Sequence, residues 1–372
     1  MRDEAEHKAD SEAVEVGARR GRDAEGVSFE TRVDRVRALI EAPLLVSKPV
    51  NVRYLTGLES TNAVLLVEPD RLRIFTDFRY LEKARATGLE VVETPRNVYS
   101  GLGGQLPDRL EFEAEVLTYA EWAVLVAAGF ELVPRYELVQ GVRAVKEEAE
   151  LEAISRSVAI TNECFERLAE QPFVGRTEKE IAWWLESLMR ELGADEPAFP
   201  IIVAAGPGGA QPHATTSDRV IEAGTTVVVD AAAKLGGYYS DCTRTFATGE
   251  LPDELARSYD VCLRAQLAAL DAVAPGVGGR EADAVARNVI AADGLGELFG
   301  HGLGHGLGME LQEQPRLRPE SEDVLAPNSV CTVEPGIYHP GLGGIRIEDL
   351  VIVDEDGPQI LTTFTKELVT VS

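Results

Sequence analysis

Short apolar runs alternate with helical patterns along the chain from residue 29 onward. The apolar residues between Val33 and Ile40 recur at helical spacing and predict a first helix. The runs that follow predict buried strands at residues 44–46 and 63–67 and further short strands at 72–76, 91–92 and 116–117. Because these strands alternate with helices, the pattern predicts an α/β domain over residues 29–140.

A second region opens at residue 146 with a long helical pattern that ends near residue 168. Another helix is predicted after Thr177-Glu178-Lys179-Glu180, which is a capping-box sequence. Later segments predict strands at residues 201–203, 225–229 and 242–246, helices from Glu254 and Glu281, and strands at 329–333, 344–347 and 350–353. Helices followed by strands, twice over, predict an α+β domain of two similar halves over residues 146–372.

The first 28 residues differ in composition from the rest. Glu, Asp, Arg, Ala and Gly dominate residues 1–28, so this segment lacks the apolar area that would offset the entropy of ordering it. We expect an acidic mobile leader or a frayed helix. The N-terminus lacks the apolar core of a signal peptide, and no run approaches the ~18 apolar residues of a membrane helix. The four cysteines form no Cys-x-x-Cys pair and suit a reducing cytosol, so we expect a cytoplasmic protein without a membrane partner.

The charge of the chain is strongly negative, at −27, with 36 basic and 63 acidic residues among 372. A field of that sign repels phosphate backbones, so a nucleic-acid partner is not expected. Only seven of the basic residues are lysines. This balance is typical of proteins adapted to high salt, and equally of acidic surfaces on Arg- and Ala-rich bacterial or archaeal proteins.

Two acidic residues flank a predicted hairpin in the C-terminal region. Asp230 ends an apolar strand, and Asp241 begins the return strand across the turn at Gly236-Gly237. A hairpin brings two such carboxylates together. Like charges at that distance repel strongly unless a cation lies between them.

Three further residues have the chemistry of metal ligands. His305 lies among glycines that let the backbone approach another group closely, and Glu334 ends the strand at residues 330–333. Arg346 and Glu348 are two apart on a predicted strand and share a face. With Asp230 and Asp241, this set carries four negative charges, which two divalent cations would neutralise. Carboxylate oxygens with a single imidazole suit Mn, Fe, Co or Zn.

The motifs around these residues resemble a known family. They are Asp-x10-Asp, Gly-His-Gly-Leu-Gly, Val-Glu-Pro-Gly-Ile-Tyr and Gly-Gly-Ile-Arg-Ile-Glu-Asp, and they resemble the pita-bread metallopeptidases, Xaa-Pro dipeptidase (prolidase) and aminopeptidase P. Residues 51–58 and 76–80 resemble the creatinase-type N-terminal domain of that family. The resemblance implies an α+β fold, with a C-terminal pita-bread domain preceded by a smaller α/β domain. The N-terminal domain and the short separation of Glu334 from Glu348 argue against the related methionine aminopeptidases.

The resemblance also implies a ligand set and a reaction. Two divalent ions, with Mn first and Co, Zn or Fe as alternatives, would be bridged by Asp241, Glu348 and a hydroxide. Asp230 would hold one ion, while His305 and Glu334 would hold the other. The bridging hydroxide would attack the peptide bond before proline, because two cations lower the pKa of water and polarise the carbonyl. Glu334 would serve as the proton shuttle.

Further roles follow from the same resemblance. Arg346 and Tyr338 would orient the carboxylates and water. His213 would lie beside the scissile amide and the proline, and His301 would form part of the pocket wall. Arg316 would bind the free carboxylate of a dipeptide, a task that suits a guanidinium. The family implies a proline-containing di- or oligopeptide substrate and a homodimer.

One position departs from the family pattern. Where the family has a second catalytic histidine, seven residues after the ligand His305, this chain has Gln312. An amide donates hydrogen bonds but carries neither a proton nor a positive charge, so catalysis should weaken while metal binding persists. The leading hypothesis is therefore a dimetal Xaa-Pro peptidase, either a dipeptidase or an aminopeptidase. The alternatives are a non-catalytic or weakly active pita-bread peptide-binding module, and a metal-free creatinase-like hydrolase, which should have lost the acidic ligands.

Overall fold

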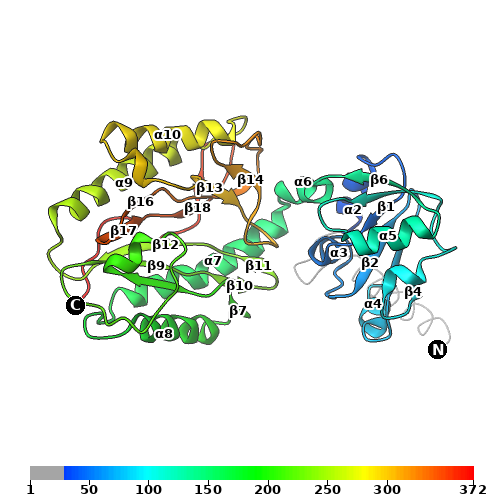
Figure 1. Cartoon of the computed structure of the whole chain (residues 1–372), viewed down its shortest axis with the longest axis horizontal. Coiled ribbons are helices and arrows are strands. Elements are labelled where there is room, and N and C mark those ends of the chain that lie inside the picture. The colour runs from blue at the N-terminus through cyan, green and yellow to red at the C-terminus, as the bar shows by residue number, and fades with distance from the viewer. Residues whose placement is uncertain (1–28) are drawn as a thin grey trace, which may run out of the picture. The chain divides into compact units, whose positions relative to one another are not determined.

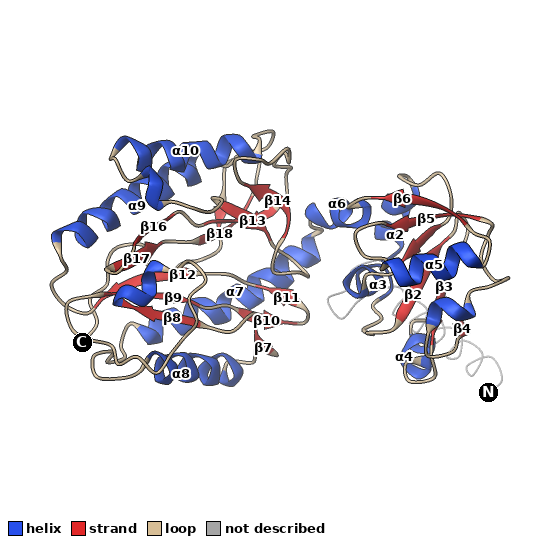
Figure 2. Ribbon diagram, in the orientation of Figure 1, coloured by secondary structure: helices blue, strands red, loops and turns tan. Residues whose placement is uncertain are grey.

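The structure is a computed structural model that describes residues 29–372, so the predicted leader at residues 1–28 lies outside the described residues. The chain divides into two compact units between Arg143 and Ala144, a few residues after Gln140. Both units mix helices with strands (Figures 1 and 2). The α+β architecture predicted from the sequence is confirmed.

The N-terminal unit is built on one six-stranded sheet with strand order β4-β3-β2-β1-β5-β6. Its strands are β1 (Leu44–Val46), β2 (Ala63–Val67), β3 (Leu72–Thr76), β4 (Glu90–Glu93), β5 (Arg109–Glu113) and β6 (Glu131–Arg135). Its helices are α2 (Phe29–Arg37), α3 (Pro49–Thr56), α4 (Leu81–Ala86), η1 (Val98–Gly101), α5 (Tyr119–Ala127) and α6 (Leu138–Ala144). The central strands β1 and β2 are buried along their whole length, which matches their unbroken apolar sequences.

One predicted strand of this unit is wrong. Val116 and Leu117 lie in a turn, because the backbone N–H groups of both donate to the carbonyl oxygen of Glu113 at the end of β5, at 3.2 and 3.1 Å. The turn leads into Thr118, whose hydroxyl and backbone form a capping box with Glu121 at the start of α5. The apolar pair is therefore part of a helix entry, which a short apolar run does not distinguish from a strand.

The C-terminal unit places four long helices around several small sheets. The helices are α7 (Glu148–Leu168), α8 (Glu178–Glu191), α9 (Asp253–Ala272) and α10 (Gly279–Ala292), with the short turns η2 (Gly206–Ala210) and η3 (Gly296–Leu298). The strands of the first half are β7 (Glu196–Pro197), β8 (Ile202–Ala205), β9 (Thr226–Asp230), β10 (Ala233–Leu235), β11 (Tyr238–Tyr239) and β12 (Thr243–Ala247). Those of the second half are β13 (Gly304–Gly306), β14 (Glu313–Leu317), β15 (Val330–Val333), β16 (Gly336–His339), β17 (Gly343–Arg346), β18 (Asp349–Ile352) and β19 (Gln359–Ile360).

The two halves of this unit have separate apolar cores. One core packs α7 and α8 against β8, β9 and β12, and the other packs α9 and α10 against β14, β15, β16, β17 and β18. Figure 1 shows the strands lying between the α7–α8 pair and the α9–α10 pair. The arrangement follows from the amphipathic helices, each of which buries one apolar stripe on a sheet. The predicted capping box at Thr177 is present, with the Thr177 hydroxyl accepting from Glu180 N at 3.2 Å.

Two local predictions near the candidate site need correction. The hairpin at Gly236-Gly237 joins only the short strands β10 and β11, and both glycines have positive φ, at 61° and 91°. The strand β12, which pairs with β9, begins at Thr243, so Asp241 lies just before it. Glu348 likewise lies in the link between β17 and β18, because its backbone N–H donates to Thr243 O at 3.1 Å instead of joining a ladder with β16.

Candidate metal centre and active site

Three carboxylates from separate segments meet at one point of the C-terminal unit. Asp230 is the last residue of β9, Asp241 lies between β11 and β12, and Glu348 lies between β17 and β18. One carboxylate oxygen from each residue lies within 4.8 Å of the other two. The antiparallel pairing of β9 with β12 sets Asp230 opposite Thr243, and the hydrogen bond from Glu348 N to Thr243 O brings in the third segment.

Two of these carboxylates are buried, the third is half-buried, and all three repel one another. Asp241 and Glu348 are 5% and 2% exposed. Burial raises the pKa of Asp230, while burial and the neighbouring Asp230 raise the pKa of Asp241 well above its ordinary value. Burial and the nearby Asp241 raise the pKa of Glu348 in the same way. The cluster is therefore costly as three bare anions and favours a cation between them.

His305 and Glu334 extend the cluster from neighbouring strands. His305 lies on β13, and its Nε2 is 3.4 Å from Glu334 Oε1 and 3.7 Å from Asp241 Oδ2. Thr332 orders both residues, because its hydroxyl accepts from His305 N at 3.0 Å and donates to Glu334 Oε1 at 3.1 Å. Gly304 is required here, since a Cβ at that position would lie 2.0 Å from Thr332 O.

Arg346 connects the cluster to its surroundings. Its Nη2 donates to Asp230 Oδ2 at 2.6 Å, and its Nε donates to the Thr243 hydroxyl at 3.0 Å. That hydroxyl in turn donates to Glu348 Oε2 at 2.8 Å. Burial opposes the charge of Arg346, but the neighbouring Tyr338 phenol and Asp230 carboxylate hold its pKa well above the ordinary value. One permanent cation therefore faces the carboxylate cluster.

Tyr338 and His301 form a second layer next to Arg346. Arg346 Nη1 donates to the Tyr338 hydroxyl at 3.1 Å, and His301 Nε2 lies 2.9 Å from the same oxygen. Burial raises the pKa of Tyr338 to about 12 and lowers the pKa of His301, so both groups are neutral near pH 7.

The donor set fits divalent cations. Asp230 Oδ1 is buried without a hydrogen-bond partner among residues 29–372, although a carboxylate oxygen in that position needs one. His305 Nδ1–H donates a hydrogen bond to Gly306 O at 3.0 Å, so in the neutral ring the lone pair of Nε2 is directed at Glu334 and Asp241. In that ring Nε2 and the two carboxylates are all acceptors, so a cation between them would satisfy all three. A histidine whose other ring N–H donates to a backbone carbonyl is the usual form of a metal ligand.

A cavity of about 630 Å³ opens onto the cluster. It is lined by every one of the five candidate ligands, by Arg346, and by four of the other predicted site residues, which are His213, His301, Gln312 and Arg316. Tyr338 is not among the lining residues and contacts the site through Arg346 and His301. Phe199, Pro200, Ile202 and Leu311 add apolar surface to the wall. The cavity thus combines polar and apolar lining residues, as sites for small ligands do.

Two buried ion pairs near the cavity were not anticipated from the sequence. Lys146 Nζ donates to Glu313 Oε1 at 2.7 Å, and both side chains are almost fully buried. This pair fixes the residue that follows Gln312. The other pair joins Arg244 to Asp349 at 2.8 Å. Neither pair is visible in the sequence. The two residues of the first pair are 167 positions apart in the chain, and those of the second pair are 105 apart.

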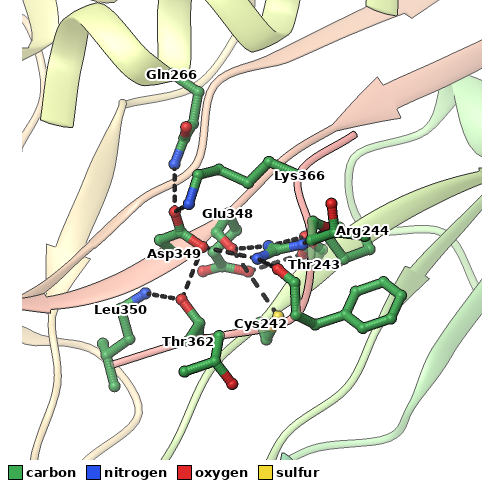
Figure 3. A network of polar contacts seen from close by, with 12 residues as sticks. Cys242, Thr243, Arg244, Gln266, Glu348, Asp349, Leu350, Thr362 and Lys366 are labelled. Atoms are coloured by element: carbon green, nitrogen blue, oxygen red, sulfur yellow. Dashed lines mark hydrogen bonds and ion pairs between the residues drawn. The ribbon is translucent and has the colours of Figure 1, made fainter. Parts of the chain in front are cut away.

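The Asp349 carboxylate is the centre of a buried polar network directly beside Glu348 (Figure 3). It accepts hydrogen bonds from Arg244 Nη2, Lys366 Nζ and Gln266 Nε2, each at 2.8 Å. The Thr362 hydroxyl donates to it at 2.7 Å. Arg244 also donates to the carbonyl oxygen of Glu348. The network therefore holds the backbone of Glu348 through its carbonyl oxygen, and Arg244 also donates to Thr243 O at 3.0 Å.

The fold and this site define a family of metallopeptidases, and the sequence matches it along most of its length. Residues 152–355 match Metallopeptidase family M24, and residues 32–145 match the Creatinase/Prolidase N-terminal domain. The chain belongs to metallopeptidase family M24 and is a peptidase. The family resemblance seen in the sequence is confirmed. Within residues 29–372, no helix is both long and apolar enough to cross a membrane.

Individual relatives carry more particular descriptions. The chain is 38% identical over 334 residues to the uncharacterized peptidase YqhT of Bacillus subtilis, covering 88% of this chain and 95% of the relative. The structure resembles an Xaa-Pro dipeptidase from Bacillus anthracis with a TM-score of 0.89 and 37% identity, over 92% of this chain and all of the other. It also resembles an X-Pro aminopeptidase from Thermotoga maritima with a TM-score of 0.83 and 35% identity, over 91% of this chain and all of the other.

Proposed function

We propose that this peptidase uses two divalent metal ions to hydrolyse the peptide bond that precedes proline. The observation that carries the proposal is the buried cluster of Asp230, Asp241 and Glu348, with His305 and Glu334 beside it on the floor of one cavity. The descriptions of similar proteins as Xaa-Pro dipeptidase and X-Pro aminopeptidase support the choice of proline peptides.

Asp241 and Glu348 would be shared by the two ions, Asp230 would complete one site, and His305 and Glu334 would complete the other. Oxygen donors with a single imidazole suit Mn best, with Co, Zn or Fe as alternatives. When bound, the two cations supply water of lowered pKa and a positive field at the scissile carbonyl. Arg346 keeps Asp230 oriented through its 2.6 Å contact, and Thr243 does the same for Glu348.

The remaining residues of the cavity wall act on the peptide. Glu334 would take a proton from the attacking water and deliver it to the leaving proline nitrogen, as a carboxylate in contact with the reacting atoms does. His213 would pack beside the scissile amide, and Arg316 would bind a substrate carboxylate with its guanidinium. Gln312 would donate a hydrogen bond to the substrate carbonyl oxygen. As a neutral donor it stabilises developing negative charge less than a cationic imidazole would.

A specific observation supports a second candidate, a peptide-binding module with little turnover. Gln312 is exposed on the cavity wall at the position where a proton-carrying side chain would be useful. A glutamine there leaves binding intact and removes one route for proton transfer. The two candidates agree on metal binding and differ only in turnover.

The test combines metal analysis with a matched pair of dipeptides. Protein loaded with Mn and freed of excess metal should contain close to two ions per chain and should hydrolyse Ala-Pro much faster than Ala-Ala. Chelation should abolish turnover and lower the thermal midpoint together, because a ligand that binds only the native state stabilises it. Asp241→Asn is the matched control, since it preserves shape while removing the charge of a shared ligand. A stoichiometry near zero contradicts the proposal. Two bound metals without turnover favour the binding module.

A further inference from the structure

Two arginines, one on strand β14 and one just after it, line the same cavity. Along this segment Glu313, Pro315 and Leu317 are buried, so the residues between them point the other way. Arg316 is one of these intervening residues, Arg318 comes one residue after the strand, and both line the cavity. Arg318 immediately follows the end of β14 and is the more exposed of the two.

The neighbouring strand locates the two side chains against the site. Arg316 is the register partner of His305, which is one of the candidate metal ligands. Arg318 starts beside Gly302, because a Cβ on that glycine would lie 2.8 Å from the Arg318 Cβ. Gly302 directly follows His301 on the cavity wall. The two arginine stems are therefore about 7 Å apart, which is two residues of a strand, along one wall.

The two guanidinium groups differ in their surroundings. Arg316 has an acidic neighbour, since Asp323 Oδ2 accepts from its backbone N–H at 2.8 Å and lies 3.9 Å from its Nη1. Within residues 29–372, the Arg318 guanidinium forms no ion pair or hydrogen bond with another residue. The Arg318 guanidinium therefore lines the cavity as a cation that no acidic residue among residues 29–372 pairs with. Such a group attracts a carboxylate of the ligand.

We propose that Arg318 binds the C-terminal carboxylate of peptides that extend one or two residues past proline, so that such peptides are substrates as well as dipeptides. This inference rests on the proposed function of the site. An extended peptide advances about 3.3–3.6 Å per residue, so two added residues cover the separation of the two arginine stems. With one added residue, the peptide carboxylate stops about one residue's length short of the Arg318 stem, and the flexible Arg318 side chain spans that distance. A guanidinium pairs with a carboxylate through two parallel hydrogen bonds, which gives the contact its preference for a free C-terminus.

The test compares acids with their amides at three lengths. The peptides are Ala-Pro, Ala-Pro-Ala and Ala-Pro-Ala-Ala, each with a free carboxylate and as the C-terminal amide. In Arg318→Gln, KM for the tripeptide or tetrapeptide acid should rise about tenfold relative to its amide, as expected for one charge-assisted contact. The acid-to-amide ratio for Ala-Pro should instead respond to Arg316→Gln. Arg318→Lys should recover part of the loss. Arg280→Gln on α10, an exposed arginine outside the cavity lining, controls for the loss of one positive charge.

The outcomes separate this inference from the proposed function. An equal effect of Arg318→Gln on acids and amides, or an effect as large on Ala-Pro as on the longer acids, overturns the role of Arg318. If the wild-type protein cleaves none of the peptides, the proposed function fails. Calorimetric titration of the metal-loaded protein with Ala-Pro-Ala and its amide then decides the role of Arg318 by itself. A tenfold loss of preference for the acid in Arg318→Gln supports it, and an unchanged preference or no measurable binding overturns it.

Discussion

Replacing Asp349 with asparagine tests how the buried network behind Glu348 stabilises the C-terminal unit. Asp349 is fully buried and lies between two cations, Arg244 and Lys366. Burial acts against ionisation, but these two cations hold the pKa of Asp349 below its ordinary value, so the carboxylate is charged at neutral pH. Asp349→Asn preserves the shape and removes that charge.

The cost follows from the individual contacts. The asparagine oxygen can still accept from Arg244 and Thr362, which both donate to Oδ1. The new amide nitrogen would face Gln266 and Lys366, the two donors at Oδ2, and can accept from neither. The Lys366 side chain is 22% exposed and can move towards solvent, whereas that of Arg244 is 2% exposed and cannot. An uncompensated buried cation costs about 3–5 kcal/mol, and the retained contacts favour the low end, about 3 kcal/mol.

Urea unfolding of the chelated protein measures this cost without a contribution from metals. A Trp122→Phe background leaves Trp183 and Trp184 on α8, so the fluorescence reports on the C-terminal unit. With a slope of about 3 kcal/mol per molar urea, the midpoint should fall by about 1 M. Asp218→Asn is the matched control, because Asp218 pairs with Lys179 at the surface with its side chain 82% exposed. Such pairs contribute about 0–1 kcal/mol. If both variants lose the same stability, the argument from buried charge is wrong.

Two further predictions concern the cavity. Gln312→His should raise kcat/KM for Ala-Pro with Mn by about tenfold at unchanged metal content. The reason is that a protonated imidazole would act as a general acid in the transition state, which the amide does not. A folded, metal-loaded variant that is no faster would contradict the attenuating role of Gln312. In chelated protein, burial raises the pKa values of Asp230, Asp241 and Glu348. The native state therefore binds more protons than the unfolded state. Its thermal midpoint should rise as the pH is lowered from 8 towards 5.5. Asp241→Asn should reduce this rise, and an identical rise in the variant would refute the assignment.

Much of the fold was predictable because its signals are local. The capping box at Thr177 and apolar residues at helical spacing predict the helix α8, and the buried strands β1 and β2 are continuous apolar runs. Where the same short apolar signal fits two structures, the prediction failed. Val116 and Leu117 belong to a turn because their backbone N–H groups donate to the carbonyl oxygen of Glu113. No pattern of residue types predicts that hydrogen bonding.

The candidate site was predictable for a different reason. Asp230, Asp241, His305, Glu334 and Glu348 were recognised as a set because each lies at a strand end or glycine-rich turn in a motif with fixed spacing. The structure brings all five to one cavity floor. Their roles as metal ligands stay predictions, because chemistry and spacing identify a set while only measurement identifies what it binds.

Only the tertiary structure decided which partners surround that set. The sequence determined the mixture of helices and strands in both regions, the acidic charge, and the residue types available for metal binding. It did not determine that Lys146 pairs with Glu313 across 167 positions, or that Arg244 and Lys366 enclose Asp349. Those contacts depend on how whole elements pack, and the periodicities of a helix or strand extend over a few residues only. For the same reason, nothing in the sequence distinguishes Arg318 from the other arginines. It lines the cavity because β14 pairs with β13.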